Sequence, residues 1–351
     1  MDRFDSKFSR RSFLAGAAGV LAAPMVIGSR AVAATDFVTM VGYGGTFQET
    51  LVKYVMTPFA AETGIKVKFV PAPDLAKIKA MQLTRSVEWD IYNGNGTWAA
   101  SGSKQGFWEK LDTSMFDLKD LAIQPTSDVV TLDLYAAGVA WDPKKYGAGK
   151  HPANLAEFFD IKKFPGRRCL RKEPDGALEA ALLADGVAPK DIYPLDLERA
   201  FKVLDRIKPG IVWASATTQT ISLVQTGEVD FSYTYNNRVK ATNEPGGGMP
   251  LAFSLDQNLI FTSPLAVLKG APNKENAMKL IAYMLRPEVQ ARMDNQLGFL
   301  PVSKKALPML SLEARKWQPD LSNPNNLMMS NEYWADNFES VSRRFQEWLL
   351  T

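Results

Sequence analysis

The chain has 351 residues, of which 46% are hydrophobic and 23% are charged. This composition can fill one large core or two smaller ones, and it excludes a disordered chain and a protein with many membrane spans. The formal net charge of +3 is unevenly placed. Residues 1–33 carry five basic and two acidic residues, which leaves 36 of the 41 basic and 36 of the 38 acidic residues for the rest. The charge balance therefore gives no support for a nucleic-acid partner.

Cysteine and histidine are each present once, as Cys169 and His151. A single cysteine excludes an intramolecular disulfide and a cysteine metal cluster, and a single histidine excludes multi-histidine metal sites. His151 lies in the turn-like segment Gly149–Pro152, so we do not expect it in a Ser-His-Asp triad. We expect no metal site, no cofactor and no catalytic residues.

The N-terminus has the pattern of an export signal. Arg10 and Arg11 precede an apolar stretch, Phe13 to Ile27, and small residues follow at 31–34. The stretch is shorter than the roughly 20 residues of a membrane span. The paired arginines resemble a twin-arginine signal, which exports folded proteins. We expect residues 1–33 to be a signal peptide that is cleaved near Ala33, with the remainder in a bacterial periplasm.

The first half of the remainder alternates strands and helices. The predicted order is strand, helix, strand, helix, strand, at residues 37–41, 47–63, 65–70, 75–86 and 89–92. This order predicts an α/β fold with an open, mostly parallel sheet and helices on both faces. Ligands of such sheets bind beyond the carboxyl ends of the strands. The loops 42–46 and 93–98 lie at this position.

A second α/β lobe is predicted at about 142–255, after the small apolar segment 135–141. Its strands are expected at 167–170, 211–213 and 230–235, and its helices at 177–184, 196–208 and 219–226. A strand at 263–268 and a pair of helices at 274–297 follow. The aromatic residues of 330–350 have near-helical spacing, and we expect them to form a packing face.

Several segments, in this order, resemble one family. They are Glu62–Val67, Gly227–Val229 with Tyr235–Arg238, Ser263–Asn273, Arg286–Gln290 and Gly298–Val302. Together they resemble type II periplasmic solute-binding proteins of ABC transporters, and in particular the spermidine/putrescine-binding type. The resemblance extends over nearly the whole chain after the leader.

The resemblance implies a monomeric receptor that is not an enzyme. Two lobes would close over a small polar solute and deliver it to a membrane permease. Lobe 1 would comprise 35–140 and 263–310, lobe 2 would comprise 141–262, and helices in 311–351 would pack on both. The crossings between the lobes would fall near 138–142 and 256–264. Small residues at 136–138 would allow a strand to bend there or to pack tightly.

The resemblance also implies positions for the ligand. Trp98 and Tyr235 fall where polyamine binders carry aromatic ligand contacts, whereas Ser263 and Gly176 fall where they carry acids. Neighbouring candidates for contacts to an amine or an anion are Glu173, Asp175 and Arg171. From their places at loop and strand ends, the other candidates are Tyr43, Gly44, Gly45, Thr46, Asn95, Trp213, Ser215, Thr217 and Asn236.

The missing acids predict a ligand less cationic than a free polyamine. It would contain an amine and be polyamine-like, or resemble an amino acid or an opine. If Arg171 or Arg238 faces the cleft, the ligand carries a carboxylate or phosphonate.

Two other functions remain open at this stage. A ferric-ion receptor of the same fold would use Tyr233 and Tyr235, which lie two apart on one strand. An exported oxidoreductase would need a cofactor motif, and Gly42–Thr46 lacks the complete G-x-G-x-x-G pattern.

Overall fold

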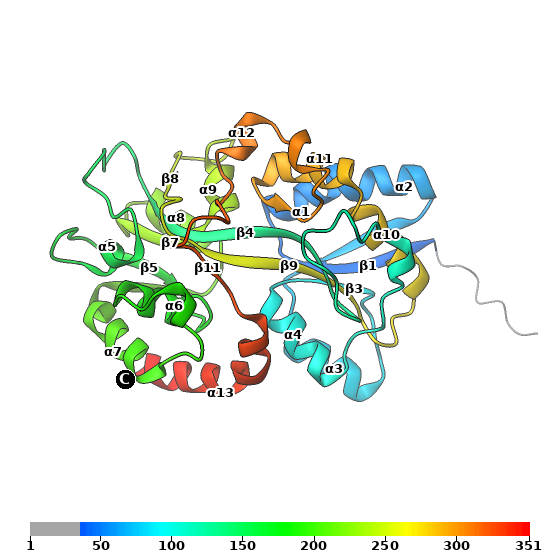
Figure 1. The fold of residues 1–351 in the computed structure, drawn as a ribbon, viewed down its shortest axis with the longest axis horizontal. Helices are drawn as coiled ribbons and strands as arrows, with labels where there is room; N and C mark the ends of the chain where they lie inside the picture. The colour runs from blue at the N-terminus through cyan, green and yellow to red at the C-terminus, as the bar shows by residue number, and fades with distance from the viewer. Residues whose placement is uncertain (1–35) are drawn as a thin grey trace, which may run out of the picture. The chain divides into compact units, whose positions relative to one another are not determined.

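The computed structural model describes residues 36–351, and the predicted signal peptide lies outside them. The described chain holds two groups of strands and helices that two long strands connect (Figure 1). The strand order is β2-β1-β3-β9-β4-β7-β5-β6. The fold is therefore the predicted α/β fold of two lobes.

Lobe 1 is built on three parallel strands, β1 (Phe37–Gly42), β2 (Lys66–Pro71) and β3 (Ile91–Asn93). Its helices are α1 (Thr46–Leu51), α2 (Thr57–Thr63), α3 (Leu75–Thr84), α4 (Gly96–Gln105), α10 (Lys274–Met284) and α11 (Pro287–Leu297). The helix predicted at 47–63 is interrupted by a π-helical turn, Val52–Met56, and the predicted helix pair at 274–297 is confirmed.

Lobe 2 has a second set of parallel strands, β5 (Arg168–Arg171), β6 (Ile211–Ala214) and β7 (Phe231–Tyr235). Its helices are α5 (Leu155–Phe159), α6 (Ala177–Ala184), α7 (Leu197–Ile207), α8 (Gln219–Gln225) and α9 (Asn236–Thr242). The apolar stripe of α7 packs inward through Phe201, Leu204 and Ile207, as its spacing predicts.

The connecting strands are β4 (Val130–Trp141) and β9 (Leu259–Val267), which pair antiparallel. In lobe 1, β9 pairs with β3, and in lobe 2, β4 pairs with β7. Gly138 is a point of tight packing, because a Cβ there would lie 2.3 Å from Asn258 Nδ2 and 2.9 Å from Phe253 Cζ. The predicted lobe boundaries stay predictions, since β4 and β9 belong to both lobes.

Short elements complete the described chain: β8 (Ala252–Phe253), β10 (Leu300–Pro301), β11 (Leu327–Met328) and α12 (Leu312–Arg315). The final helix α13 (Asn331–Leu350) runs from α4 of lobe 1 to α7 of lobe 2 (Figure 1). Trp334 and Phe345 of α13 are fully buried, so the predicted packing face is confirmed. Among the helices of residues 36–351, none is long and apolar enough to cross a membrane.

Candidate functional site

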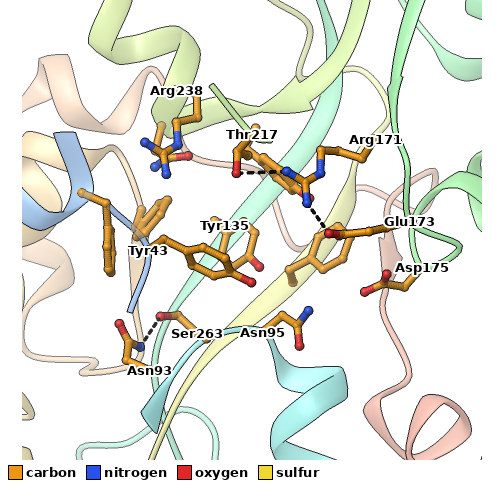
Figure 2. Close-up of a pocket in the computed structure, with 16 residues that line it drawn as sticks. Tyr43, Asn93, Asn95, Tyr135, Arg171, Glu173, Asp175, Thr217, Arg238 and Ser263 are labelled. Atoms are coloured by element: carbon orange, nitrogen blue, oxygen red, sulfur yellow. Dashed lines mark hydrogen bonds and ion pairs between the residues drawn. The ribbon is translucent and has the colours of Figure 1, made fainter. Parts of the chain in front are cut away.

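A pocket lies at the carboxyl ends of β1, β3, β5 and β7, against β4 and β9. The free volume open to the centres of water-sized molecules is small, about 60 Å³. The pocket contains eight of the predicted residues: Tyr43, Asn95, Arg171, Glu173, Asp175, Thr217, Tyr235 and Ser263. Figure 2 shows the polar side chains arranged around the tyrosines.

Aromatic rings form much of the wall. Tyr135 on β4 stacks on Phe261 of β9 at 5.4 Å between ring centroids, and Tyr235 meets Tyr135 edge-on at 5.5 Å. Phe299 lies 5.4 Å from Tyr135 and 6.2 Å from Phe47. Such a surface of aromatic rings suits the methylene groups of a ligand, which form no hydrogen bonds.

One guanidinium of the pocket is paired. Arg171, at the end of β5, forms an ion pair with Glu173 and donates to Thr217 Oγ1 at 3.3 Å. Its buried Nε has no hydrogen-bond partner among the described residues. The Arg171–Glu173 pair therefore has little net charge but retains a donor for a ligand.

The second guanidinium is not paired. Arg238 on α9 contacts only the carbonyl oxygen of Gly44 among described hydrogen-bond partners, at 3.4 and 3.5 Å. No carboxylate of residues 36–351 lies within 4 Å of it. Burial lowers the pKa of Arg238, which reflects the energetic cost of a desolvated cation without a counter-ion. An anionic ligand group would supply that counter-ion.

The position of Arg238 is fixed by the start of α9. The Asn236 amide donates to the carbonyl oxygens of Gly298 and Trp317, both at 2.9 Å, and its Oδ1 accepts from the amide of Ala136 at 3.1 Å. The fully buried Asn236 thus uses its side chain to anchor α9. Its predicted place in the ligand site is not supported by this geometry.

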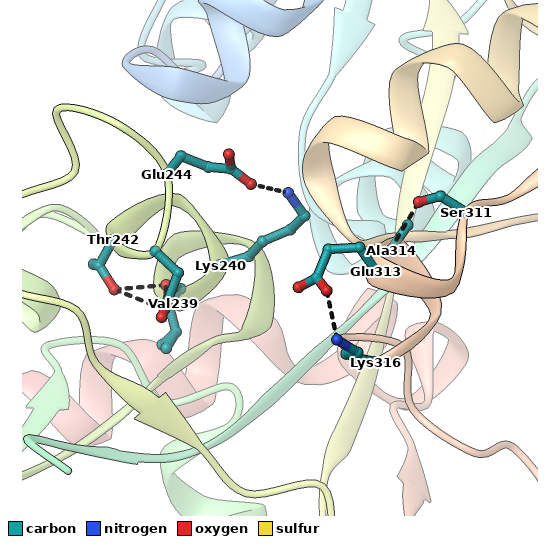
Figure 3. Close-up of polar contacts among 9 residues, drawn as sticks. Val239, Lys240, Thr242, Glu244, Ser311, Glu313, Ala314 and Lys316 are labelled. Carbon is teal, nitrogen blue, oxygen red and sulfur yellow. Dashed lines mark hydrogen bonds and ion pairs between the residues drawn. The ribbon is translucent and has the colours of Figure 1, made fainter.

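Further along α9, ion pairs lie where the helix meets the segment around α12 (Figure 3). Lys240 Nζ lies 2.6 Å from Glu244, and Lys316 Nζ lies 2.6 Å from Glu313. The aliphatic part of Lys240 packs closely against Gly298, where a Cβ would lie 3.0 Å from Lys240 Cδ. Of these contacts, the packing of Lys240 on Gly298 joins the helix that presents Arg238 to the segment after α11.

An acid without a cation partner lies across the pocket from Arg238 (Figure 2). Asp175 Oδ2 accepts a weak hydrogen bond from Thr97 Oγ1 at 3.5 Å, and no basic side chain of the described residues lies within salt-bridge distance. Burial, followed by the charges of Glu173 and Glu179, raises the pKa of Asp175 to about 8. An ammonium group would relieve both effects.

The floor of the pocket is polar and neutral. The Asn93 amide donates to Ser263 Oγ at 3.2 Å and to the carbonyl oxygen of Pro264 at 3.0 Å. Asn93 Oδ1 is buried and has no partner among the described residues. Asn95 caps α4, accepting from the amide of Trp98 at 2.9 Å.

The remaining predicted residues do not line this pocket. Trp98 packs edge-on against Phe338 of α13 at 6.2 Å, and Trp213 packs against Phe345 and Trp348 at 5.6 and 5.7 Å. Both tryptophans therefore anchor the final helix. Ser215 lies with Trp213 beside that helix, outside the pocket.

The glycine-rich loop contributes only in part. Thr46 and Gly45 are exposed at the start of α1, and Gly44 meets the ligand site only through its carbonyl contact with Arg238. Gly45 has φ 72°, and a Cβ there would lie 3.3 Å from Arg238 Nη1. The loop thus leaves room for the guanidinium.

Several lining residues were not predicted as site residues: Phe47, Asn93, Gly94, Tyr135, Asn237, Arg238, Phe261 and Phe299. From the sequence, Arg238 is only a conditional candidate, which would imply an anionic ligand group if it faced the cleft. Tyr135, Phe261 and Phe299 lie in apolar segments that are indistinguishable from core without their pairing. Asn93 lies at the end of the predicted third strand, which is the signal that could have identified it.

Comparison with known proteins gives a consistent result. Residues 55–322 match the family model "Bacterial extracellular solute-binding protein". A gamma-aminobutyric acid-binding protein of Pseudomonas aeruginosa PAO1 is 30% identical over 336 residues, covering 92% of this chain and 94% of that protein. The spermidine/putrescine-binding periplasmic protein of Escherichia coli K12 is 22% identical over 362 residues, covering 97% of both chains.

A solved structure is also similar. The structure described as "Atu4243-GABA receptor" superposes with a TM-score of 0.80 at 33% identity, covering 89% of this chain and 97% of that chain. The chain belongs to the bacterial extracellular solute-binding proteins and has the type II periplasmic binding fold of ABC-transporter receptors. The predicted resemblance is confirmed, and the chain's relatives are receptors for amine-containing solutes.

Proposed function

We propose that this receptor captures a short ω-amino acid, of the size of γ-aminobutyric acid, in the pocket between its lobes. One observation carries the proposal. A guanidinium without a counter-ion, that of Arg238, and a carboxyl group without a cation, that of Asp175, face the same small pocket. A ligand with one anionic and one cationic end satisfies both.

The carboxylate end of the ligand is assigned to Arg238 and to the free Nε of Arg171. A guanidinium is suited to this role, because its planar donors match a carboxylate. The ammonium end is assigned to Asp175, with Glu173 close by on the same loop.

The aromatic wall and the small volume limit what joins the two ends. Methylene groups can lie against the rings of Tyr135, Phe261 and Phe299, where their apolar surface is buried. The small free volume of the pocket supports a chain of a few carbons over a sugar-conjugated opine.

A free polyamine fits the charges less well. Two ammonium ends would place one cation close to Arg171 or Arg238, and like charges repel strongly in a desolvated site. The same guanidiniums oppose a ferric ion. In addition, Tyr233 is not among the residues that line the pocket, so it does not join Tyr235 there.

The family supports the wider role. We infer a non-enzymatic, monomeric receptor in the periplasm that is exported by the predicted leader. It closes around its solute and docks on an ABC permease in the inner membrane. Two contacts already join the lobes across the pocket, Thr97 with Asp175 and Arg238 with Gly44. A ligand that adds contacts to both lobes favours this closed arrangement.

The test compares three compounds with the same carbon chain: γ-aminobutyric acid, butyrate and putrescine. Each is titrated into purified protein and followed by calorimetry and by thermal shift, which grows with the logarithm of ligand concentration over Kd. We expect γ-aminobutyric acid to bind at least about 100-fold more tightly than either analogue, since putrescine leaves the Arg238 guanidinium without an anion and butyrate leaves Asp175 without an ammonium group. Equal or tighter binding of putrescine would refute the proposal.

A further inference from the structure

Glu179 is a fully buried carboxylate that the proposed ligand contacts do not use. It lies one turn into α6, directly after the loop Glu173–Gly176, and is 0% exposed. No basic side chain of residues 36–351 lies within salt-bridge distance of it. A buried carboxylate is unfavourable unless neighbouring groups donate hydrogen bonds to it, so its partners indicate its role.

Three donors converge on this carboxylate. Its Oε2 accepts from the backbone amide of Gly176 at 2.8 Å. Its Oε1 accepts from the Tyr193 hydroxyl at 2.9 Å and from the Trp334 indole Nε1 at 2.7 Å. One oxygen therefore binds the loop with the ligand-site acids, and the other binds groups outside that loop.

The outside groups belong to α13 or contact its start. Trp334 is in the first turn of α13 and is 0% exposed. The Tyr193 hydroxyl accepts from the amide of Ser330, the residue that caps α13, at 3.2 Å. Glu179 thus connects the acid loop to both the cap and the first turn of this helix.

Helix α13 contacts both lobes. Near its start, Asp336 pairs with Lys104 of α4 and Phe338 meets Trp98. Near its end, Trp348 Nε1 donates to Asp205 of α7 at 2.8 Å. The start of α13, which binds Glu179 through Trp334, therefore belongs to a helix that is anchored in both lobes.

Besides Glu179, the side-chain contacts of the acid loop are Arg171 with Glu173 and Thr97 with Asp175. Gly176 has φ 86°, and a Cβ there would lie 3.3 Å from Phe261 and 3.4 Å from the Tyr233 hydroxyl, so the turn lies tight against the pocket wall. Asp175 immediately precedes this glycine. A shift of the Gly176 amide moves the carboxyl group that faces the ligand.

We propose that Glu179 is a positioning residue, which holds the loop Glu173–Gly176 in its ligand-binding geometry and couples that loop to α13. The ligand-affinity part of this inference rests on the proposed function, since Asp175 is the acid that it places. Glu179 itself does not line the pocket.

The first test uses Glu179→Gln, which keeps the size of the side chain. A glutamine offers one oxygen, so it cannot accept from Gly176 and from the Tyr193–Trp334 pair at once. We expect affinity for γ-aminobutyric acid to fall about tenfold or more, because a buried donor is left without an acceptor. Trp334→Phe removes one donor and keeps an aromatic ring, although a smaller one, and we expect a loss of about fivefold.

Trp348→Phe is the matched control. It removes the same type of indole–carboxylate bond from the same helix, but far from the acid loop. We expect affinity within twofold of the wild type. If Glu179→Gln and Trp334→Phe lower the melting temperature as Trp348→Phe does and leave the Kd unchanged, Glu179 is only structural and the inference is wrong.

The pH profile of binding gives a readout that a structural role would not move. The titratable groups around Glu179 are Glu173 and Asp175 on its loop, Tyr193, Tyr233 on β7 and Tyr333 on α13. The charge of Glu179 helps to raise the pKa of Asp175. Removal of that charge is therefore expected to move the midpoint of pH-dependent amine binding to lower pH. An unchanged midpoint contradicts the inference.

Hydrogen exchange separates failure of this inference from failure of the proposed function. The amide of Gly176 should exchange faster in Glu179→Gln and Trp334→Phe than in Trp348→Phe, whatever the ligand is. If the wild type binds no ω-amino acid but this pattern holds, the proposed function fails and the coupling stands. If γ-aminobutyric acid binds but Gly176 is equally protected in all variants, the coupling fails.

Discussion

The two lobes contribute different chemistry to the pocket. Every charged side chain comes from lobe 2: Arg171, Glu173, Asp175 and Arg238. Lobe 1 contributes uncharged residues, which include Tyr43, Phe47, Asn93, Gly94, Asn95, Ser263 and Phe299. Under the proposed function, lobe 2 would hold both charged ends of the ligand, whereas lobe 1 would add uncharged contacts.

This division predicts how affinity is distributed. Loss of a lobe 2 charge leaves a buried ligand charge unpaired, which is strongly unfavourable. Loss of a lobe 1 contact removes apolar burial, which is a smaller effect.

Arg238→Gln is expected to have the largest effect. The variant removes the cation assigned to the ligand carboxylate, and the Kd for γ-aminobutyric acid should rise about 100-fold or more in calorimetry. Arg344→Gln is the control, because Arg344 pairs with exposed Glu198 on the outer helices. If Arg238→Gln binds like this control, lobe 2 does not hold the carboxylate through Arg238.

The assignment of the ligand ammonium to Asp175 predicts that ligand affinity depends on pH. With a pKa of about 8, Asp175 is mostly protonated at pH 7 and mostly ionised at pH 9. Affinity should therefore rise about tenfold from pH 7 to pH 9, while the ligand amine stays charged. Ligand binding near pH 7 should therefore release a proton. This release is measured as a binding enthalpy that depends on the buffer.

The pH dependence should disappear in Asp175→Asn, which has no carboxyl group to titrate. Asp191→Asn, at an exposed position, should retain the wild-type profile. A profile that is flat in the wild type, or unchanged in Asp175→Asn, would assign the ammonium to another group.

A lobe 1 variant should have a moderate effect. Tyr43→Ala removes part of the aromatic wall, and we expect about a fivefold to tenfold loss of affinity from lost apolar burial. Tyr43→Phe keeps the ring and should lie within about twofold of the wild type. A loss with Tyr43→Ala as large as that of Arg238→Gln would contradict the division between the lobes.

Substitution of the buried residue Asp294 is expected to have the smallest effect on ligand binding. Its main effect should be on the stability of the fold. Asp133 and Asp294 are both 0% exposed, and neither carboxylate oxygen of Asp294 has a hydrogen-bond partner among the described residues. Burial, followed by the charge of Asp133, raises the pKa of Asp294. The folded protein thus holds protons that the unfolded chain releases.

The protonated Asp294 contributes fully to the free energy of unfolding below its unfolded pKa of about 3.9. This contribution is lost as the pH rises toward the raised pKa of Asp294 in the folded protein. Asp294→Asn should therefore melt at a higher temperature than the wild type at pH 8, with the difference shrinking toward pH 4. Asp191→Asn should show no such change. A lower melting temperature of Asp294→Asn at pH 8 would mean that the carboxylate has a favourable partner.

Much of the fold could be predicted from the sequence, because its strands and helices alternate with clear periodicity. The predicted helix at 177–184 coincides with α6. The acid-containing loop after β5 could also be predicted, since it follows directly from a strand end. Trp98 and Trp213 could not be placed, because whether such aromatics face the cleft depends on α13, which is distant in sequence.

The aromatic wall escaped prediction for a related reason. Tyr135 and Phe261 face each other through the pairing of β4 with β9, across more than a hundred residues of chain. Local periodicity carries no information on that register. The unpaired state of Arg238 likewise depends on which acids the fold brings near it.

The central claim is that Arg238 and Asp175 hold opposite ends of one zwitterion. A crystal structure of the protein with γ-aminobutyric acid tests it most directly. We predict the ligand carboxylate at hydrogen-bond distance from the Arg238 guanidinium and the ammonium at hydrogen-bond distance from the Asp175 carboxyl. A ligand in the reverse orientation, or one that leaves Arg238 without an anionic partner, would contradict the account.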